Sequence, residues 1–275
     1  MRLVNYMKRI TLLLFISLAG VSLQAQKTME VGVFGGGSYY IGDLNPAMHF
    51  LMTKPAYGVV ARLNLDSRWT ARLTAYRGEV AGDDEVSGRV AGRELKFESP
   101  MTDISAVIEL NFFNYITGST RNFLTPYIFG GVGVFMFRPE SDGVALRELG
   151  TEGQNTGFDG RSPYNLFQIA IPFGFGFKYS LSKRLAFAFE WGMRKTMTDY
   201  LDDVSTTYYL EGESISASNQ AGMLSDPTRS HQPYQARGNA GTNDWYSFFG
   251  VTVTYRFTIG KDRGCSSFIE QRRDY

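Results

Sequence analysis

Large apolar residues alternate with polar or small residues, one position in two, along most of this chain. The pattern is clearest in "QIAIPFGFGFKY", where one face carries Ile169, Ile171, Phe173, Phe175, Phe177 and Tyr179. The other face carries Gln168, Ala170, Pro172, Gly174, Gly176 and Lys178. A period of two is typical of a β-strand, because successive side chains point to opposite faces. We therefore predict a strand here with one wholly apolar face.

Seven further segments alternate in the same way, which makes eight predicted strands in all. They lie near residues 30–41, 57–65, 69–76, 103–112, 127–137, 185–194 and 249–257. The face opposite the apolar one carries several charged residues, namely Arg62, Arg72, Glu109, Lys178, Glu190, Arg194 and Arg256. A soluble β-sandwich seldom buries such charges on facing strands. The apolar faces therefore favour contact with lipid.

The connections between these strands alternate in length. Those at 66–68 and 181–183 are tight and that at 114–125 is moderate, whereas 43–56, 82–100, 138–164 and 200–244 are long and polar. Short periplasmic turns and long extracellular loops are typical of outer-membrane barrels. We predict an all-β fold, an eight-stranded antiparallel transmembrane β-barrel over residues 26–260, in contact with outer-membrane lipid and with both termini in the periplasm. Girdles at its two rims would use Tyr39, Tyr57, Trp69, Tyr127, Tyr179, Trp191 and Trp245.

The two ends of the chain differ from the barrel. Residues 1–25 have a basic start and a short apolar core, which indicates a secretory signal peptide. Residues 261–275 form a charged tail, which we predict to lie in the periplasm and to bind a partner. The residues expected to do so are Lys261, Asp262, Arg263, Cys265, Phe268, Arg272 and Arg273. Because Cys265 is the only cysteine, it is either a free thiol or half of an intermolecular disulfide.

Composition adds two points. The 30 glycines, 21 phenylalanines and 16 tyrosines fit a glycine- and aromatic-rich β protein. A net charge of +1 gives no indication of nucleic-acid binding. An eight-stranded barrel is just wide enough for side chains to fill it. The seven inward charges are therefore expected to form an internal ion-pair network that closes the lumen, unless they sit in residual lumen water, and general porin activity is not expected.

Candidate chemistry is sparse. The two histidines, His49 and His231, lie in long loops without a nucleophile in a recognisable frame, so we expect no catalysis and no cofactor. The run "TDYLDDVSTTY" carries Asp199, Asp202 and Asp203, but its spacing does not match an EF-hand calcium loop. We interpret it as a solvated loop, or as carboxylates that pair with Arg194 and Lys195, and predict no metal site. The glycine-rich segment "GVFGGGSYYIG" is not followed by the lysine of a phosphate-binding loop. Its glycines instead suit a curved barrel wall.

Several motifs resemble one family. They are "EVGVFGGGSYYIGDLNP", "AYGVVARLNLDSRW", "ELNFFNY", "TPYIFGGVGVFMFRP", "TEGQ", "IAIPFGFGFKY" and "EWGMRKTMTDYLDDVSTTY". Together they resemble the PorG family, outer-membrane β-barrels of the type IX secretion system of Bacteroidota, over residues 30–257. Two departures are the absence of a tryptophan before "TEGQ" and an insert at 209–242.

The resemblance implies a non-enzymatic component that joins the outer membrane to a periplasmic ring built from the lipoprotein PorK and its partner PorN. Such systems export proteases and gliding adhesins. Within "TDYLDDVS", Asp199, Tyr200, Asp202 and Asp203 are expected to shape the outer rim or to contact another barrel. Two alternatives from the residues alone are a lipid-modifying outer-membrane enzyme, which would depend on the histidines, and a surface adhesion barrel, which would depend on residues 209–242.

Overall fold

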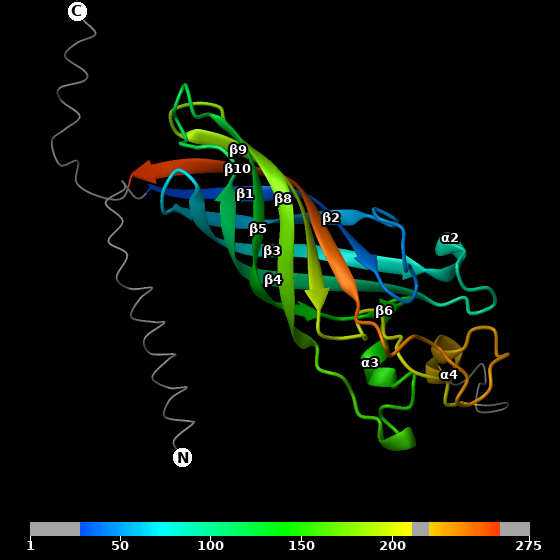
Figure 1. Cartoon of the computed structure of the whole chain (residues 1–275). Helices are drawn as coiled ribbons and strands as arrows, with labels where there is room; N and C mark the ends of the chain where they lie inside the picture. The colour runs from blue at the N-terminus through cyan, green and yellow to red at the C-terminus, as the bar shows by residue number, and fades with distance from the viewer. Residues whose placement is uncertain (1–27, 211–219, 259–275) are drawn as a thin grey trace, which may run out of the picture.

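A closed ring of strands dominates the computed structural model, which describes residues 28–210 and 220–258 (Figure 1). Eight long strands form it: β1 (Thr28–Ile41), β2 (Lys54–Asn64), β3 (Trp69–Asp83), β4 (Lys96–Asn111), β5 (Leu124–Phe137), β8 (Phe167–Ser180), β9 (Leu185–Thr196) and β10 (Trp245–Thr258). Each pairs antiparallel with the next in this order. Pairing of β1 with β10, from Thr28 opposite Thr258 to Ile41 opposite Trp245, closes the ring. The predicted eight-stranded antiparallel barrel is confirmed.

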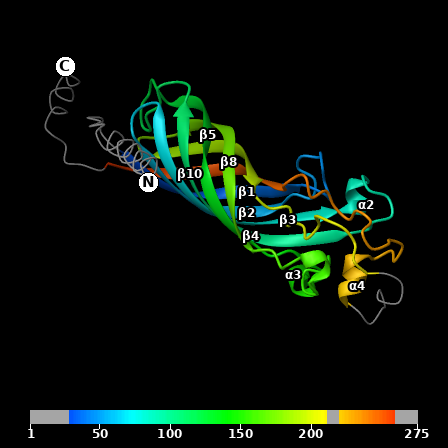
Figure 2. The ribbon, with the colours of Figure 1, turned by 60° about the horizontal axis from the view of Figure 1, so that its bottom comes forward.

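Smaller elements all lie in the connections. They are α2 (Asp84–Ser87), β6 (Glu140–Ser141), β7 (Val144–Ala145), α3 (Leu146–Leu149), the 3-10 turn η1 (Phe158–Gly160) and α4 (Gln220–Ser225). None of the described helices is long and apolar enough to cross a membrane. In both ribbon views α2, α3 and α4 gather at one end of the barrel (Figures 1 and 2). We call this the long-loop end, and the end with the connections 65–68, 112–123 and 181–184 the short-turn end.

The outer face of the barrel is apolar as the alternation predicts. On β8, Phe173, Phe175 and Phe177 are 41%, 45% and 51% exposed, while their neighbours Pro172, Gly176 and Lys178 are buried. Exposed apolar residues continue around the wall on the other strands, among them Val33, Val59, Leu73, Ile108, Val132, Phe187, Phe189 and Val251. A band of this kind suits the hydrocarbon core of a bilayer.

Two of the predicted girdle residues occupy other positions. Tyr127 is buried inside the barrel, so its assignment to a girdle is wrong. Glycines 130, 131 and 133 obscure the two faces of β5, and the strand's outward set is in fact the even-numbered one. Tyr39 does point away from the lumen, but the connection 42–53 folds down over it, with the ring of Phe50 at 4.9 Å. Tyr39 is therefore covered by protein rather than exposed to lipid.

Some aromatic residues fill the barrel instead of facing lipid. Phe34 stacks on Tyr76 at 4.3 Å, and Phe248 packs edge-on to Tyr76 at 5.3 Å. This cluster lies toward the long-loop end and also includes Tyr40, Phe97, Phe135, Phe137 and Tyr246. The interior therefore has two zones, an aromatic one below the long loops and a charged one toward the short turns.

Strands β3 and β4 are longer than the alternation alone indicates. Their pairing continues to Asp83 opposite Lys96, so both ends of the loop expected at 82–100 are strand and only residues 84–95 connect β3 to β4. Asp83 caps α2, because its carboxylate accepts hydrogen bonds from the backbone N–H groups of Glu85 and Val86. Phe97 and Leu44 leave no room for a side chain at Gly82, because a Cβ atom there would lie only 2.7 Å from the Phe97 ring. Gly82, the first residue of the expected loop, is therefore a packing residue at the end of β3.

Candidate functional site

The charged zone of the lumen is centred on Glu109 of β4. Its carboxylate lies 3.2 Å from Arg62 Nε, 3.0 Å from Arg72 Nη1 and 2.5 Å from Lys178 Nζ. These four side chains are almost completely buried, and they come from β2, β3, β4 and β8. Alternation explains the convergence, because each residue occupies an inward position on its own strand.

A second carboxylate, Glu190 of β9, extends this cluster. It pairs with Arg72 and accepts hydrogen bonds of 3.0 Å from the hydroxyls of Tyr76 and Tyr127. The guanidinium of Arg72 also lies 4.5 Å from the ring centre of Phe129. Arg72 therefore links the two carboxylates across the barrel.

Arg194 pairs with a residue outside the predicted set, beside the aromatic rings of Tyr76 and Phe248. Its Nε lies 4.0 Å from Asp103, which also accepts a 2.7 Å hydrogen bond from Tyr246. Glu30 is likewise buried and accepts from Asn64, Thr117 and Thr254. Both Asp103 and Glu30 stand at inward positions in the alternation, so the sequence does place them inside. Four basic residues (Arg62, Arg72, Lys178, Arg194) thus face four acidic ones (Glu30, Asp103, Glu109, Glu190), and their formal charges cancel.

One residue of the predicted network lies apart from it. Arg256 is only half-buried and donates a hydrogen bond to the backbone carbonyl of Thr117, at the short-turn end. Thr117 belongs to the connection 112–123, which folds over this mouth and brings Tyr115 and Thr117 into buried positions. The alternation did not distinguish a residue at the mouth from one in the middle of the lumen. The predicted tail residues 261–275 lie outside the described part of the chain.

At the long-loop end, the segment 199–205, here called the rim segment, folds inward. Asp202 and Asp203 are 1% and 0% exposed, so the expectation of a solvated loop is wrong. Asp203 accepts hydrogen bonds from Thr151 and, at 2.6 Å, from the Tyr164 hydroxyl. Burial raises the pKa of Asp203 to about 6, although the nearby Arg237 opposes that shift.

The rim segment is held by a buried ion pair that sequence reasoning missed. Arg237 lies 3.2 Å from Glu152 and donates a 2.5 Å hydrogen bond to the carbonyl of Asp203. Glu152, from "TEGQ", also accepts from the backbone N–H groups of Ser205 and Thr206 at 2.9 and 3.1 Å. Asp203 therefore pairs with Arg237, at 4.0 Å, and Asp202 accepts from the Tyr40 hydroxyl and the backbone N–H of Val204. The expected pairing with Arg194 and Lys195 is wrong. We call residues 147–166, 197–208 and 225–244 together the loop cap.

The two histidines have partners but no catalytic frame. His49 Nδ1 lies 3.0 Å from the hydroxyl of Tyr39, on the outer wall. His231 Nδ1 lies 2.9 Å from Asp226 and 3.4 Å from the Thr228 hydroxyl. In a relay of the serine-hydrolase type, one ring nitrogen of the histidine bonds to the carboxylate and the other bonds to the hydroxyl. At His231, the carboxylate of Asp226 and the hydroxyl of Thr228 both lie next to the same nitrogen, Nδ1. Within residues 28–210 and 220–258, no group of three or more His, Cys, Asp or Glu is placed to hold a metal ion.

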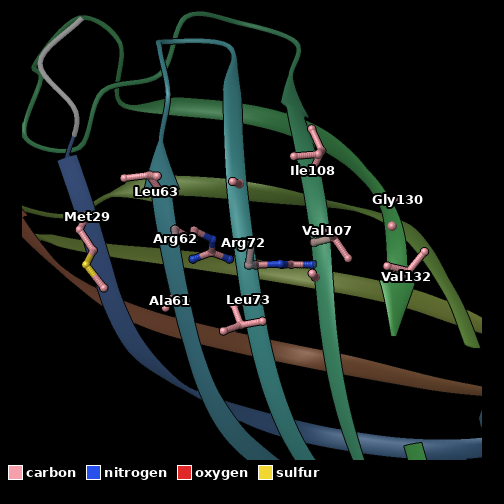
Figure 3. Close-up of a pocket in the computed structure, with 13 residues that line it drawn as sticks. Met29, Ala61, Arg62, Leu63, Arg72, Leu73, Val107, Ile108, Gly130 and Val132 are labelled. Atoms are coloured by element: carbon pink, nitrogen blue, oxygen red, sulfur yellow. The ribbon is translucent and has the colours of Figure 1, made fainter. Parts of the chain in front are cut away.

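A hollow of about 580 Å³ lies on the outside of the barrel (Figure 3). Small residues, Ala61, Ala71, Ala106 and Gly130, form its floor, and Leu63, Leu73, Ile108 and Val132 border it. Arg62 and Arg72 contribute to its wall, but their guanidinium groups turn into the lumen toward Glu109. The hollow is therefore part of the apolar outer band and offers no acid or base for catalysis.

Comparison with known proteins places the chain in a family. Residues 8–209 match the family model described as "Domain of unknown function (DUF6089)". The chain belongs to the DUF6089 family. The matched region includes β1 to β9, Glu152 and the rim segment, but ends before Arg237 and β10. The cap's central ion pair therefore joins the DUF6089 region to the part of the chain that follows it.

Solved structures with a similar arrangement are distant from this DUF6089 protein in sequence. The attachment invasion locus protein Ail of Yersinia pestis is 8% identical, with a TM-score of 0.43, over 85% of this chain and 100% of Ail. The N-terminal β-barrel domain of OprF from Pseudomonas aeruginosa is 12% identical, with a TM-score of 0.38, over 84% of this chain and 98% of that domain. OprG, an outer membrane protein of the same organism, is 13% identical, with a TM-score of 0.39, over 86% of this chain and 100% of OprG. No curated protein matches the chain.

Proposed function

We propose that this barrel is a non-enzymatic component of the type IX secretion system that anchors a periplasmic ring, made of PorK-like and PorN-like proteins, to the outer membrane. The observation that carries the proposal is the filled lumen, in which four basic and four acidic residues are buried and compensate one another. We expect a barrel so filled to leave no open path for solutes. Its function then depends on the surfaces it presents at its two ends.

The lengths of the loops support one orientation of the barrel in the membrane. Long connections of outer-membrane barrels face the outside and short turns face the periplasm. Thr28 and Thr258 pair at the short-turn end, which is the periplasmic side in this orientation. The resemblance of several sequence motifs to the PorG family supports a role in type IX secretion, and the charged sequence of residues 261–275 supports contact with a periplasmic partner.

A pull-down of the tagged full-length protein from native outer membranes, without reducing agent, tests the proposal. PorK-like and PorN-like proteins are expected with the wild type and are expected to be reduced by truncation after Gly260. If Cys265 forms an intermolecular disulfide, Cys265→Ser removes a reducible adduct and leaves the remaining contacts. Replacement of Arg272 and Arg273 by lysine is the matched control, because it keeps the tail's charge. A barrel recovered without ring proteins contradicts the proposal.

A second experiment separates the scaffold from an enzyme. The double variant His49→Ala/His231→Ala removes both imidazoles, so a lipid-modifying enzyme would lose its function whereas a scaffold keeps cargo secretion at the wild-type level. In planar bilayers the wild-type protein is expected to give no steady conductance. Steady channels would contradict the filled-lumen argument.

A further inference from the structure

A tyrosine hydroxyl lies between two buried carboxyl groups under the loop cap. Tyr40, near the end of β1, donates a hydrogen bond to Asp202 Oδ2, and its hydroxyl is 3.3 Å from Asp244 Oδ1. All three side chains are essentially inaccessible to solvent. Asp202 belongs to the rim segment and Asp244 precedes β10, so the contact joins the barrel wall to both ends of the connection 197–244.

The hydrogens available at this contact determine its protonation. A tyrosine hydroxyl carries one hydrogen and can donate it to one carboxylate only. The backbone N–H of Leu44 takes one lone pair of the hydroxyl, at 3.3 Å. The outer oxygens of the two carboxyl groups already accept from Val204 and Leu201, each at 2.9 Å. The second carboxyl group can therefore bond to Tyr40 only if it carries a proton and donates it.

The charges around the contact also favour a bound proton. In the described part of the chain, no basic group lies within ion-pair distance of Asp202 or Asp244. Two more carboxyl groups, Asp43 and Asp199, face them. The nearest basic residues pair elsewhere: Arg93 binds Asp84 at 2.6 Å, and Arg237 binds Glu152 at 3.2 Å.

Burial is the main reason that the pKa values of Asp202 and Asp244 are raised well above the ordinary range. Asp43 and Asp199 add to the shift at Asp202, and Asp202 adds to it at Asp244. Burial also raises the pKa of Asp199 to about 7.

We propose that Tyr40, Asp202 and Asp244 form a proton-dependent latch, which holds the loop cap over the barrel mouth while one proton is shared and releases it when both carboxyl groups ionise. A raised folded-state pKa means that the stabilisation is complete below the ordinary aspartate value of about 3.9. It is lost as the pH rises through the raised values. This latch gives the rim segment a role that does not depend on the proposed part in secretion.

Hydrogen exchange reads the latch directly, because the amide N–H groups of Leu201 and Val204 donate to the two carboxyl groups. The full-length protein is measured in detergent micelles between pH 5 and 9, as protection factors corrected for the intrinsic pH dependence of exchange. We expect protection of the peptide 199–206 to fall at least about tenfold over this range, since one pKa unit of differential interaction corresponds to a factor of ten. Protection in β8 should stay constant.

Asp202→Asn and Asp244→Asn, made separately, are each expected to remove the pH dependence, because an amide donates to the Tyr40 oxygen at every pH. Asp142→Asn is the control: Asp142 is exposed and pairs with Lys96, so this variant should respond to pH as the wild type does. Wild-type protection that does not change with pH overturns the latch, whether or not the variants fold. A folded asparagine variant that keeps the wild-type response also overturns it.

Discussion

Replacing Glu109 by glutamine tests whether the barrel depends on its buried ion pairs. Arg62 and Lys178 have Glu109 as their only ion-pair partner among the described residues, whereas Arg72 also pairs with Glu190. The change leaves four basic groups in the lumen against three carboxylates, in a space without solvent access. Removing one partner of a buried pair costs about 3–5 kcal/mol, because the remaining charge is uncompensated.

The loss of stability is measured by urea unfolding in micelles. The unfolded fraction is detected by its slower migration in a gel. With a denaturant slope of about 1–3 kcal/mol per molar urea, the predicted loss lowers the midpoint by at least about 1 M. Glu98→Gln is the matched control on the same strand. Glu98 is exposed where it meets Lys54, and such a surface pair contributes less than about 1 kcal/mol.

Adding Lys178→Met to Glu109→Gln should recover part of the loss, because it restores equal numbers of positive and negative charges. A folded Glu109→Gln protein that unfolds at the same urea concentration as the wild type would refute the reasoning. The lumen charges would then be solvated by internal water rather than stabilised by one another.

Two other predictions concern the wall and the cap. Gly192→Val should destabilise the barrel by about 1–3 kcal/mol in the same urea assay, because a Cβ there comes within 2.6 Å of the Phe129 ring; Gly35→Val, whose Cβ meets nothing within 4 Å, should be close to neutral. Arg237→Met should leave the barrel's midpoint nearly unchanged but make residues 197–244 sensitive to limited proteolysis, because Glu152 loses its only ion-pair partner in the described part of the chain. Equal proteolysis of this variant and the wild type would show that Arg237 does not hold the cap.

The barrel itself could be predicted because its determinants are local. Alternation at residues 169–179 and 185–191 identifies strands directly, and it also places Lys178 and Glu190 inside. Strand ends were harder to predict. Pro100 looks like a loop residue, yet it stands within β4 opposite Glu79. Nothing near it in the sequence distinguishes such a proline from one that ends a strand.

The loop cap could not be predicted in the same way. Arg237 and Glu152 are 85 positions apart, and neither lies in a periodic segment. Their pairing depends on the whole path of three connections over the mouth. The acidic composition of the "TDYLDDVS" run suggested exposure to water. Burial of Asp202 and Asp203 requires partners, such as Tyr40 and Tyr164, that come from distant parts of the chain.

The cancellation of charge in the lumen has a consequence for assembly. Its eight residues come from β1, β2, β3, β4, β8 and β9, so no short run of consecutive strands contains the complete set. A partly built sheet in a bilayer would present uncompensated arginine or glutamate to hydrocarbon, where ionised groups are strongly disfavoured. Insertion and ring closure must therefore occur together, or on a surface that shields the open edge. The pairs that close the mature barrel thus also prevent its early fragments from entering the membrane alone.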